Sequence, residues 1–214
     1  MTATAPADGR LARSARTRAA VIDALLGLHL DGDLSPTAGR VAERAGVALR
    51  TVYGHFADLE SLYAEAGQRA MAQVRELSTA FTAGWADEPG RLDLDDRARR
   101  FAEARAVVLE WLLPISQAAT LREALSPEMQ SNRQRFVALG DSEVRTLFAP
   151  ELARLDGAAA MRAVDALHVV AGGPAWAALR QDRRLSPEAA AALLADLVVA
   201  TAHAVLVTPA SGRR

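Results

Sequence analysis

Residues 35–62, SPTAGRVAERAGVALRTVYGHFADLESL, restrict the possible folds of this chain more than any other segment. Two helices that meet at a steep angle need a small residue where they touch, and Ala42 supplies it. The turn between them needs a residue that tolerates positive φ, and Gly46 follows shortly after. The apolar packing between these helices would come from Val41, Ala45, Val47 and Val52. A helix-turn-helix is the simplest unit with these requirements at this spacing.

Helical periodicity dominates the rest of the chain and no alternating strand pattern is present, so we expect an all-α protein. After a flexible tail at 1–9, a first helix is expected over 11–30 and a second up to Gly46. The second helix begins either with Ser35 as its cap and Pro36 in the first turn, or with Thr37 as its cap. A third, short helix is expected over 49–55. Later helices are expected at 58–81, 93–113, 115–125, 128–148, 157–180 and 187–207.

Three local signals refine these ranges. Pro114 predicts a break in the helical pattern between 93 and 125, and Gly172-Gly173-Pro174 predicts a kink or break inside 157–180. Ser-Pro-Glu at 126–128 and at 186–188 marks two helix starts. The apolar stretch 189–207 contains Asp196 and His203, so we interpret it as a buried helix and expect no association with a membrane.

The composition excludes several classes of protein. The net charge is −1, so any nucleic-acid site must be a local basic patch. All 25 basic residues are Arg, and no Cys is present, which excludes disulfides and zinc–thiolate sites. Nothing at the N-terminus resembles a signal peptide, and we expect a cytoplasmic protein.

The short third helix would expose a mixed polar and apolar face. One to two turns are too short for an isolated helix, so its neighbours must hold it. A cation, hydrogen-bonding groups and a residue without a side chain suit close approach to a DNA groove and its phosphates. The residues of this outer face are Leu49, Arg50, Thr51, Tyr53, Gly54 and His55.

The same segment resembles a known family. AGV at 45–47 followed by TVYGHF at 51–56 is similar to the signature of the TetR family of bacterial transcription regulators. The preceding helix, from Arg18 through Val21-Ile22 to Leu28 and Gly32, resembles that family's first helix. The resemblance covers residues 16–62, and the remaining chain matches only in length, helix content and two long terminal helices.

The resemblance implies which residues contact DNA. Positions matching Leu49, Arg50 and Tyr53 lie at or near base edges in the major groove. Those matching Thr51, Tyr53 and His55 touch phosphates, Thr37 meets the backbone at the start of the second helix, and Phe56 is a core aromatic. The complete DNA-binding set that we expect is Arg18, Thr37, Leu49, Arg50, Thr51, Tyr53, Gly54 and His55.

Three residues depart from the family pattern. Ala48 replaces the Ser that often caps the third helix, and Leu59 replaces a phosphate-binding Lys. Both changes weaken the expected contacts with the DNA backbone. His29 stands where a Phe is usual. Compensation is expected from an Arg-rich N-terminal arm, which either follows phosphates or enters the minor groove. Its cations are Arg10, Arg13, Arg16 and Arg18.

The chain beyond the helix-turn-helix is expected to dimerise and to bind a ligand. We place the DNA-binding domain at 1–57 and the helical ligand-sensing and dimerisation domain at 58–214. The two terminal helices would pair with those of a second copy in a four-helix bundle. The predicted interface residues are Leu193, Leu194, Leu197, Val198, Thr201, Ala204 and Val205. The predicted effector-binding residues are Trp111, Gln117, Met129, Arg133, Phe136, His168 and Trp176.

These features predict a ligand-responsive transcription regulator. The expected partners are a palindromic double-stranded DNA operator, a second copy of the chain and a small, largely apolar effector that releases a repressor from DNA. No catalytic constellation is found, so we expect no enzyme, no cofactor and no metal, and His29, His168 and His203 are interpreted as core or interface residues. The alternative is a helical interaction protein whose helix-turn-helix no longer reads DNA.

Overall fold

The computed structural model describes residues 5–85, 89–123 and 126–207, and no strand occurs among them. This confirms the all-α prediction. The described residues form two compact units. The first unit takes in residues up to Ala72 and those from Pro114 to Asn132, and the second takes in Gln73 to Leu113 and everything from Arg133 onward. The first unit therefore extends past the boundary expected at residue 57.

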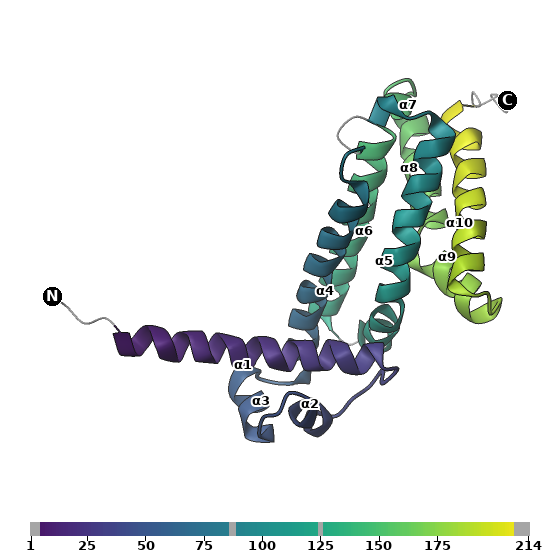
Figure 1. Cartoon of the computed structure of the whole chain (residues 1–214). Helices are drawn as coiled ribbons and strands as arrows, with labels where there is room; N and C mark the ends of the chain where they lie inside the picture. Colours follow the sequence, from purple (N-terminus) through teal and green to yellow (C-terminus); the bar gives the residue numbers. More distant parts are fainter. Residues whose placement is uncertain (1–4, 86–88, 124–125, 208–214) are drawn as a thin grey trace. The chain divides into compact units, whose positions relative to one another are not determined.

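The first unit is built on α1 (Ala5–Leu30), α2 (Ala38–Arg44), α3 (Leu49–His55) and the beginning of α4 (Leu59–Thr82). Both α2 and α3 contact α1, and the N-terminal part of α1 continues beyond them (Figure 1). Apolar residues recur at helical spacing along these helices and meet in one small core. Its most buried members are Val21, Leu25, Val41, Val52 and Leu62.

The N-terminal segment corrects one expectation. Residues 5–9, expected in a flexible tail, belong to α1, whereas residues 1–4 lie outside the described part of the chain. The physical reason is composition: Ala and Arg, which make up most of 10–20, are among the strongest helix formers, so the helix continues without any tertiary contact to require it.

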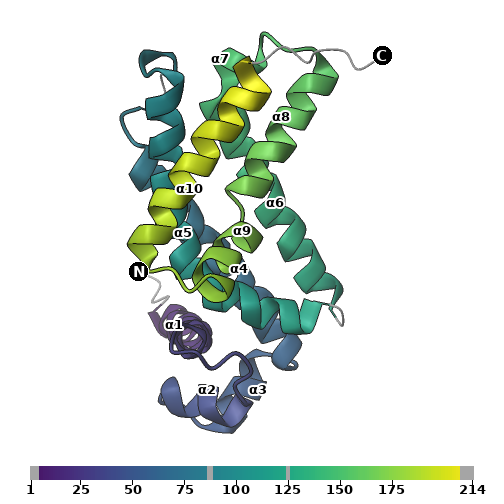
Figure 2. The ribbon, with the colours of Figure 1, turned by 90° about the vertical axis from the view of Figure 1, so that its right-hand side faces the viewer.

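The second unit contains the rest of α4, the 3₁₀ turn η1 (Pro89–Arg91), most of α5 (Leu94–Glu123) and α6 (Pro127–Leu147), α7 (Ala149–Leu152), α8 (Gly157–Val170), α9 (Gly173–Ala177) and α10 (Pro187–Ala202). Two π-helical segments, η2 (Ala178–Asp182) and η3 (His203–Val207), follow α9 and α10. Figure 2 shows α8 and α10 side by side. Their facing sides enter an apolar core that includes Phe148, Leu167, Trp176, Leu194 and Val198.

Side-chain caps fix the helix starts that the sequence marks. Ser186 Oγ accepts a hydrogen bond from Ala189 N at 3.2 Å, and Ser126 Oγ accepts one from Met129 N at 3.3 Å. Pro187 follows its cap directly, where a missing N–H costs nothing because that group would have no helical partner. Both predicted Ser-Pro-Glu starts are confirmed.

The two predicted helix breaks have different outcomes. Gly172-Gly173-Pro174 does end α8 and start α9, and Gly172 has no room for a side chain because a Cβ would lie 2.8 Å from the His168 carbonyl oxygen. The break expected at Pro114 was wrong, since α5 continues through it. A proline removes one helical hydrogen bond, and burial of Leu109 before it and Ala118 after it offsets that loss.

One described helical stretch, Pro187–Val207, is long and apolar enough to cross a membrane, with a mean hydropathy of 2.1. By itself this is weak evidence, because core helices of soluble proteins meet the same criteria. Here Ala190, Leu194 and Val198 are fully buried in the core of the second unit. We therefore keep the interpretation of this stretch as a core helix.

Candidate nucleic-acid interface

The helix α3 has a buried side and an exposed side. Val52 is only 1% exposed and Phe56, which follows the helix, is 2% exposed, so both anchor α3 in the first unit. Leu49 is 47% exposed and Tyr53 is 52% exposed. Both side chains are large, and they lie one turn apart on the same helix.

The exposed side of α3 is a continuous face, which we call the α3 face: Leu49, Arg50, Tyr53 and Gly54. These residues are exposed and stand at positions i, i+1, i+4 and i+5, so they point in the same direction. Thr51 and His55 are half-buried at its two edges. The side chains that the sequence predicts for base contact are therefore exposed in the isolated chain.

Gly54 leaves open space on the α3 face. A Cβ built at Gly54 meets no atom within 4 Å. Glycine in a helix costs about 1 kcal/mol relative to alanine. No contact among the described residues requires a glycine at this position.

The helix α2 is fixed by its cap and by the turn after it. Thr37, one of the two candidate caps, accepts a hydrogen bond from Arg40 N through Oγ1 at 3.3 Å, which settles the open alternative against Ser35. Gly46 has φ of +66°, the left-handed conformation expected for the turn. Ala42 is 3% exposed, and Ala48 precedes α3 without a side-chain cap.

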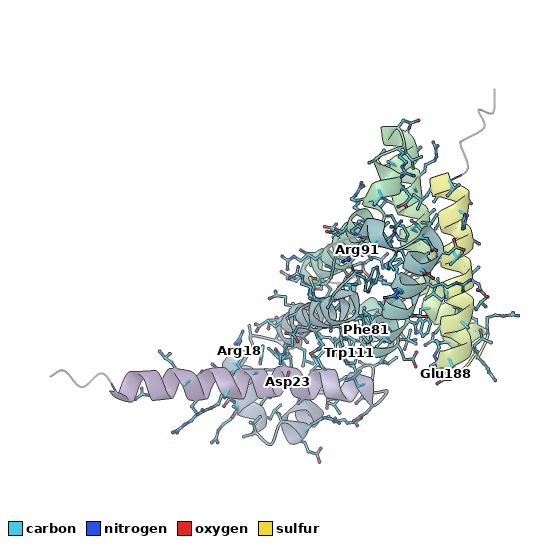
Figure 3. All side chains as sticks on the ribbon, turned by 45° about the horizontal axis from the view of Figure 1, so that its top comes forward. Arg18, Asp23, Phe81, Arg91, Trp111 and Glu188 are labelled. Atoms are coloured by element: carbon cyan, nitrogen blue, oxygen red, sulfur yellow. The ribbon has the colours of Figure 1, made fainter. Side chains whose placement is uncertain are left out.

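Arg18 has a role that differs from the one expected. Its guanidinium donates to Glu65 Oε2 at 2.9 Å, pairs with the other oxygen of Glu65 and donates to the His55 carbonyl oxygen. It also lies 4.5 Å from the centre of the Phe56 ring. Arg18, labelled in Figure 3, therefore helps to hold the end of α3, and phosphate contact by this side chain, which is 40% exposed, stays a prediction.

Sequence reasoning missed how α2 is held against α1. Arg44 at the end of α2 pairs with Asp31, and its guanidinium lies over Gly27. A Cβ at Gly27 would be 2.8 Å from Arg44 Nη2, so the glycine makes room for this contact. The only available signal was a helical glycine flanked by apolar residues, which does not identify its partner.

The N-terminal part of α1 carries exposed cations whose side chains have no partner among the residues that the structure describes. Arg10, Arg13 and Arg16 are exposed, and none of their side chains has a hydrogen bond or ion pair with another described residue. On a helix, residues three apart are separated by about 60°, so the three share one side of α1. We call these three residues the basic stripe; with Arg18, which also has contacts inside the first unit, they make up the predicted arm.

The predicted effector-binding residues fall in different places. Gln117 and Met129 belong to the first unit, where Met129 is 5% exposed. The other five belong to the second unit, with Trp111 on α5 (Figure 3) and Trp176 on α9. Trp176 is 1% exposed and donates from Nε1 to Glu110 Oε2 at 2.9 Å, so contact with a ligand is corrected to a core role in this conformation. The residues left as predictions in the second unit are Trp111, Arg133, Phe136 and His168.

A half-buried polar cluster of the second unit was not foreseen from the sequence. Arg105 donates to the Ala171 carbonyl oxygen at 3.1 Å and pairs with Glu143 at 3.1 Å. Burial lowers the pKa of Arg105, and the Glu143 carboxylate opposes that shift. His168 Nδ1 lies 2.8 Å from Asp141 Oδ1 in the same region. This cluster secures the end of α8, where carbonyl groups lack helical partners.

An open hollow of about 450 Å³ lies in the second unit. It is lined by Phe81, Ala83, Trp85, Arg100, Glu103 and Ala104. None of the seven predicted effector-binding residues is among them, so this hollow gives those predictions no support.

The predicted dimer residues divide into two groups. Leu194 and Val198 are fully buried in the core of their own chain and cannot contact a partner, which corrects their assignment. They face inward because α10 packs on α8 with that side. Leu193 and Leu197 are each 40% exposed, Ala204 is exposed, and Thr201 and Val205 are half-buried. These five remain predictions.

The histidines of the two units lie in different surroundings. His29 is 2% exposed in the first unit, whereas His203 is half-exposed and lies 2.5 Å from Asp95 Oδ1. Within the described ranges, no group of three or more His, Asp or Glu side chains could hold a metal ion.

Comparisons by sequence identify nothing: no family model matches the chain, and no curated protein matches it. Comparison with solved structures does find similar folds. A transcriptional regulator from Rhodococcus sp. Rha1 has a TM-score of 0.62 at 18% identity, covering 92% of this chain and 99% of its own. A Mesorhizobium loti protein assigned to the TetR-family transcriptional regulators has a TM-score of 0.65 at 19% identity, covering 90% of this chain and 98% of its own.

A third similar structure is NalD of Pseudomonas aeruginosa, the secondary repressor of the MexAB-OprM multidrug efflux pump. Its TM-score is 0.55 at 23% identity, and the match covers 88% of this chain and 96% of that one. The shared feature in all three is the fold, with nearly the full length of each chain included.

The contacts of Arg18 predict its effect on stability. In Arg18→Gln, the His55 carbonyl and the Glu65 carboxylate lose a charged donor, so the free energy of unfolding should fall by about 1–2 kcal/mol. Arg16→Gln is the matched control, because Arg16 is exposed two residues away and should change stability by less than about 0.5 kcal/mol. Urea unfolding followed by circular dichroism measures both, and equal stability of the two variants would contradict the role assigned to Arg18.

Proposed function

We propose that this chain, which has the fold of the TetR-type transcriptional regulators, is a DNA-binding transcription regulator. The observation that carries the proposal is the α3 face, on which Leu49, Arg50 and Tyr53 are exposed on a short helix held by its neighbours. The similar structures support it at the level of the fold. A helix presented in this way fits the width of the major groove.

Each residue of the interface then has a distinct task. Arg50 offers a planar fork for the acceptors of guanine, and Leu49 and Tyr53 make further contacts at base edges. Thr37, Thr51 and His55 contact phosphates at the edges of the α3 face. Gly54 lets the helix backbone come close to the groove wall. Ala48 and Leu59 stand where a capping Ser and a phosphate-binding Lys are usual, so contacts with the DNA backbone are weakened there. Arg10, Arg13 and Arg16 compensate with phosphate contacts of their own.

A homodimer makes such a small reading surface sufficient. One short helix buries too little surface for tight binding, whereas two copies about 34–36 Å apart match successive major grooves of a palindromic operator. Leu193 and Leu197 on α10 and Ala204 on η3 are exposed, which supports the proposed interface with a second copy. Small and apolar side chains suit close packing of helices in a bundle.

The proposed mode of action is repression relieved by a small, largely apolar effector. NalD, whose fold is similar, is a repressor of a multidrug efflux pump, which supports this mode by analogy. A ligand that binds one spacing of the two heads better than another shifts the population of the dimer and lowers its DNA affinity. The protein acts in the cytoplasm, where its operator is found, and without catalysis.

A helical interaction protein is the second candidate. The observation that favours it is that α3 starts at Ala48 with no side-chain cap, so the helix start is weaker than a serine would make it. Selection of DNA from a random pool distinguishes the two, because a folded protein that enriches no sequence is not a DNA reader.

Two substitutions test the assignment of base and phosphate contacts. Arg50→Ala should weaken operator binding by about 1–3 kcal/mol and relax the preference at one base pair. Thr51→Ala should weaken binding to all sequences alike, because a phosphate contact carries no base information. Gel shifts on the selected operator and its single-base variants measure both effects. Unchanged affinity in both variants would mean that α3 is not the reading helix.

Gly54→Ala should have opposite effects on stability and binding. The added Cβ meets no atom inside the protein, so the helix should become more stable by about 0.5–1 kcal/mol. On DNA the same methyl group stands between the α3 face and the groove, so affinity should fall. Gly157→Ala, at an exposed helix start with equally open space, should leave affinity unchanged. Undiminished DNA binding by Gly54→Ala would refute close approach at this position.

The basic stripe is tested by the salt dependence of binding. Each lost phosphate contact reduces the slope of log affinity against log salt by about 0.9. The triple variant with Arg10, Arg13 and Arg16 changed to Gln should therefore bind more weakly and show a shallower slope by roughly two to three. A triple change of Arg145, Arg154 and Arg183 to Gln removes the same charge from exposed positions elsewhere. If both triples give the same slope, the stripe contacts no phosphate.

A further inference from the structure

Arg122, in the last turn of α5, joins three segments of the first unit. Its Nη1 lies 3.0 Å from Glu60 Oε1, and its Nη2 donates to Ser35 Oγ at 3.2 Å. Its Cζ lies 4.1 Å from the centre of the Tyr63 ring. The side chain is 21% exposed, so these contacts are partly shielded from water. One guanidinium thus links α5, the start of α4 and the turn before α2.

The contacts continue through the aromatic ring of Tyr63. This ring is packed against the imidazole of His29, with centroids 5.4 Å apart. His29 Nδ1 lies 2.8 Å from the Asp33 carbonyl oxygen. Burial lowers the pKa of His29, which favours the neutral imidazole, so the proton on Nδ1 is donated to that carbonyl. The contacts of Arg122 therefore continue through Tyr63 and His29 to Asp33, just after the end of α1.

Asp33 completes the path to α2. One of its carboxylate oxygens accepts a hydrogen bond from Ser35 N at 3.3 Å, and the other lies 2.6 Å from Arg40 Nη1 on α2. The turn from Asp31 to Thr37 is therefore held from two directions, by Arg122 through Ser35 and by His29 through Asp33. These contacts hold the turn that precedes the Thr37 cap of α2, and α3 packs on α2.

We propose that Arg122 is a positioning residue for DNA binding, which fixes the turn before α2 and so transmits the position of α5 to the two helices of the helix-turn-helix. The inference rests on the proposed function. It follows from the continuity of α5, a single helix that belongs to the second unit up to Leu113 and to the first from Pro114. A displacement of its last turn moves the Arg122 guanidinium, which is hydrogen-bonded to Ser35 and stacked on Tyr63.

The chemistry of the side chain matches this task. A planar guanidinium can donate to a hydroxyl and a carboxylate from one edge while its face lies on an aromatic ring. A lysine ammonium is a single point charge and cannot do all three. Arg122→Lys should therefore keep the ion pair with Glu60 and lose the link to Ser35, which separates positioning from charge.

The first test measures DNA binding. Arg122→Gln should weaken binding to the selected operator about tenfold, with base preference and salt slope unchanged because Arg122 touches no DNA, and Arg122→Lys should lie between Gln and wild type. Arg145→Gln, which removes an exposed cation from α6, should bind like wild type. Wild-type affinity in Arg122→Gln, or a salt slope reduced as by a lost phosphate contact, would overturn the proposal.

The second test needs no DNA and uses hydrogen exchange of the full chain. Amides of residues 34–45 should exchange faster in Arg122→Gln and Ser35→Ala than in wild type, and the double variant should add little to Arg122→Gln alone. Unaltered exchange in this segment, or fully additive effects, would overturn the proposal. If Arg122→Gln does not fold, Arg122→Lys and Ser35→Ala carry the same comparison. If the wild type selects no DNA, the proposed function is refuted. The hydrogen-exchange result then still decides whether Arg122 fixes the turn before α2.

Discussion

The exposed face of α3 depends on the contacts that hold a seven-residue helix in place. A helix of this length has too few internal hydrogen bonds to persist in water, so its stability must come from packing. Val52 supplies the apolar anchor in the middle, and Arg18 supplies the polar anchor at the end by donating to the His55 carbonyl while resting on Phe56. The outward side chains are free for another partner only because these inward contacts suffice without them.

Arginine serves this protein in two distinct ways. Arg18, Arg44 and Arg122 each use the flat guanidinium to join helices, combining ion pairs or hydrogen bonds with contact against a ring or a glycine. Such multidentate contacts fix geometry more firmly than a point charge can. Arg50 and the basic stripe on α1 have no partner within the described residues and remain available for phosphates and bases. The net charge of −1 does not reveal which arginines have partners inside the protein and which do not.

Three helices run through the boundary between the two compact units. α4, α5 and α6 each contribute residues to both units. A rigid helix carries a displacement along its length, whereas a linker would absorb it. The contacts of Arg122 with Ser35, Glu60 and Tyr63 place one end of such a helix against the turn that positions α2.

The sequence by itself determined the local elements of the helix-turn-helix. The bounds of α3, the left-handed Gly46 and the exposure of Leu49, Arg50 and Tyr53 follow from helix periodicity, turn chemistry and the placement of Val52 and Phe56, all of which act within a few residues. Only the tertiary structure decided that Arg18 clamps α3, that Leu194 and Val198 face their own core, and that α5 continues through Pro114. These outcomes depend on partners distant in the chain, such as Glu65 for Arg18, and a helical pattern states which residues share a face but not what that face meets.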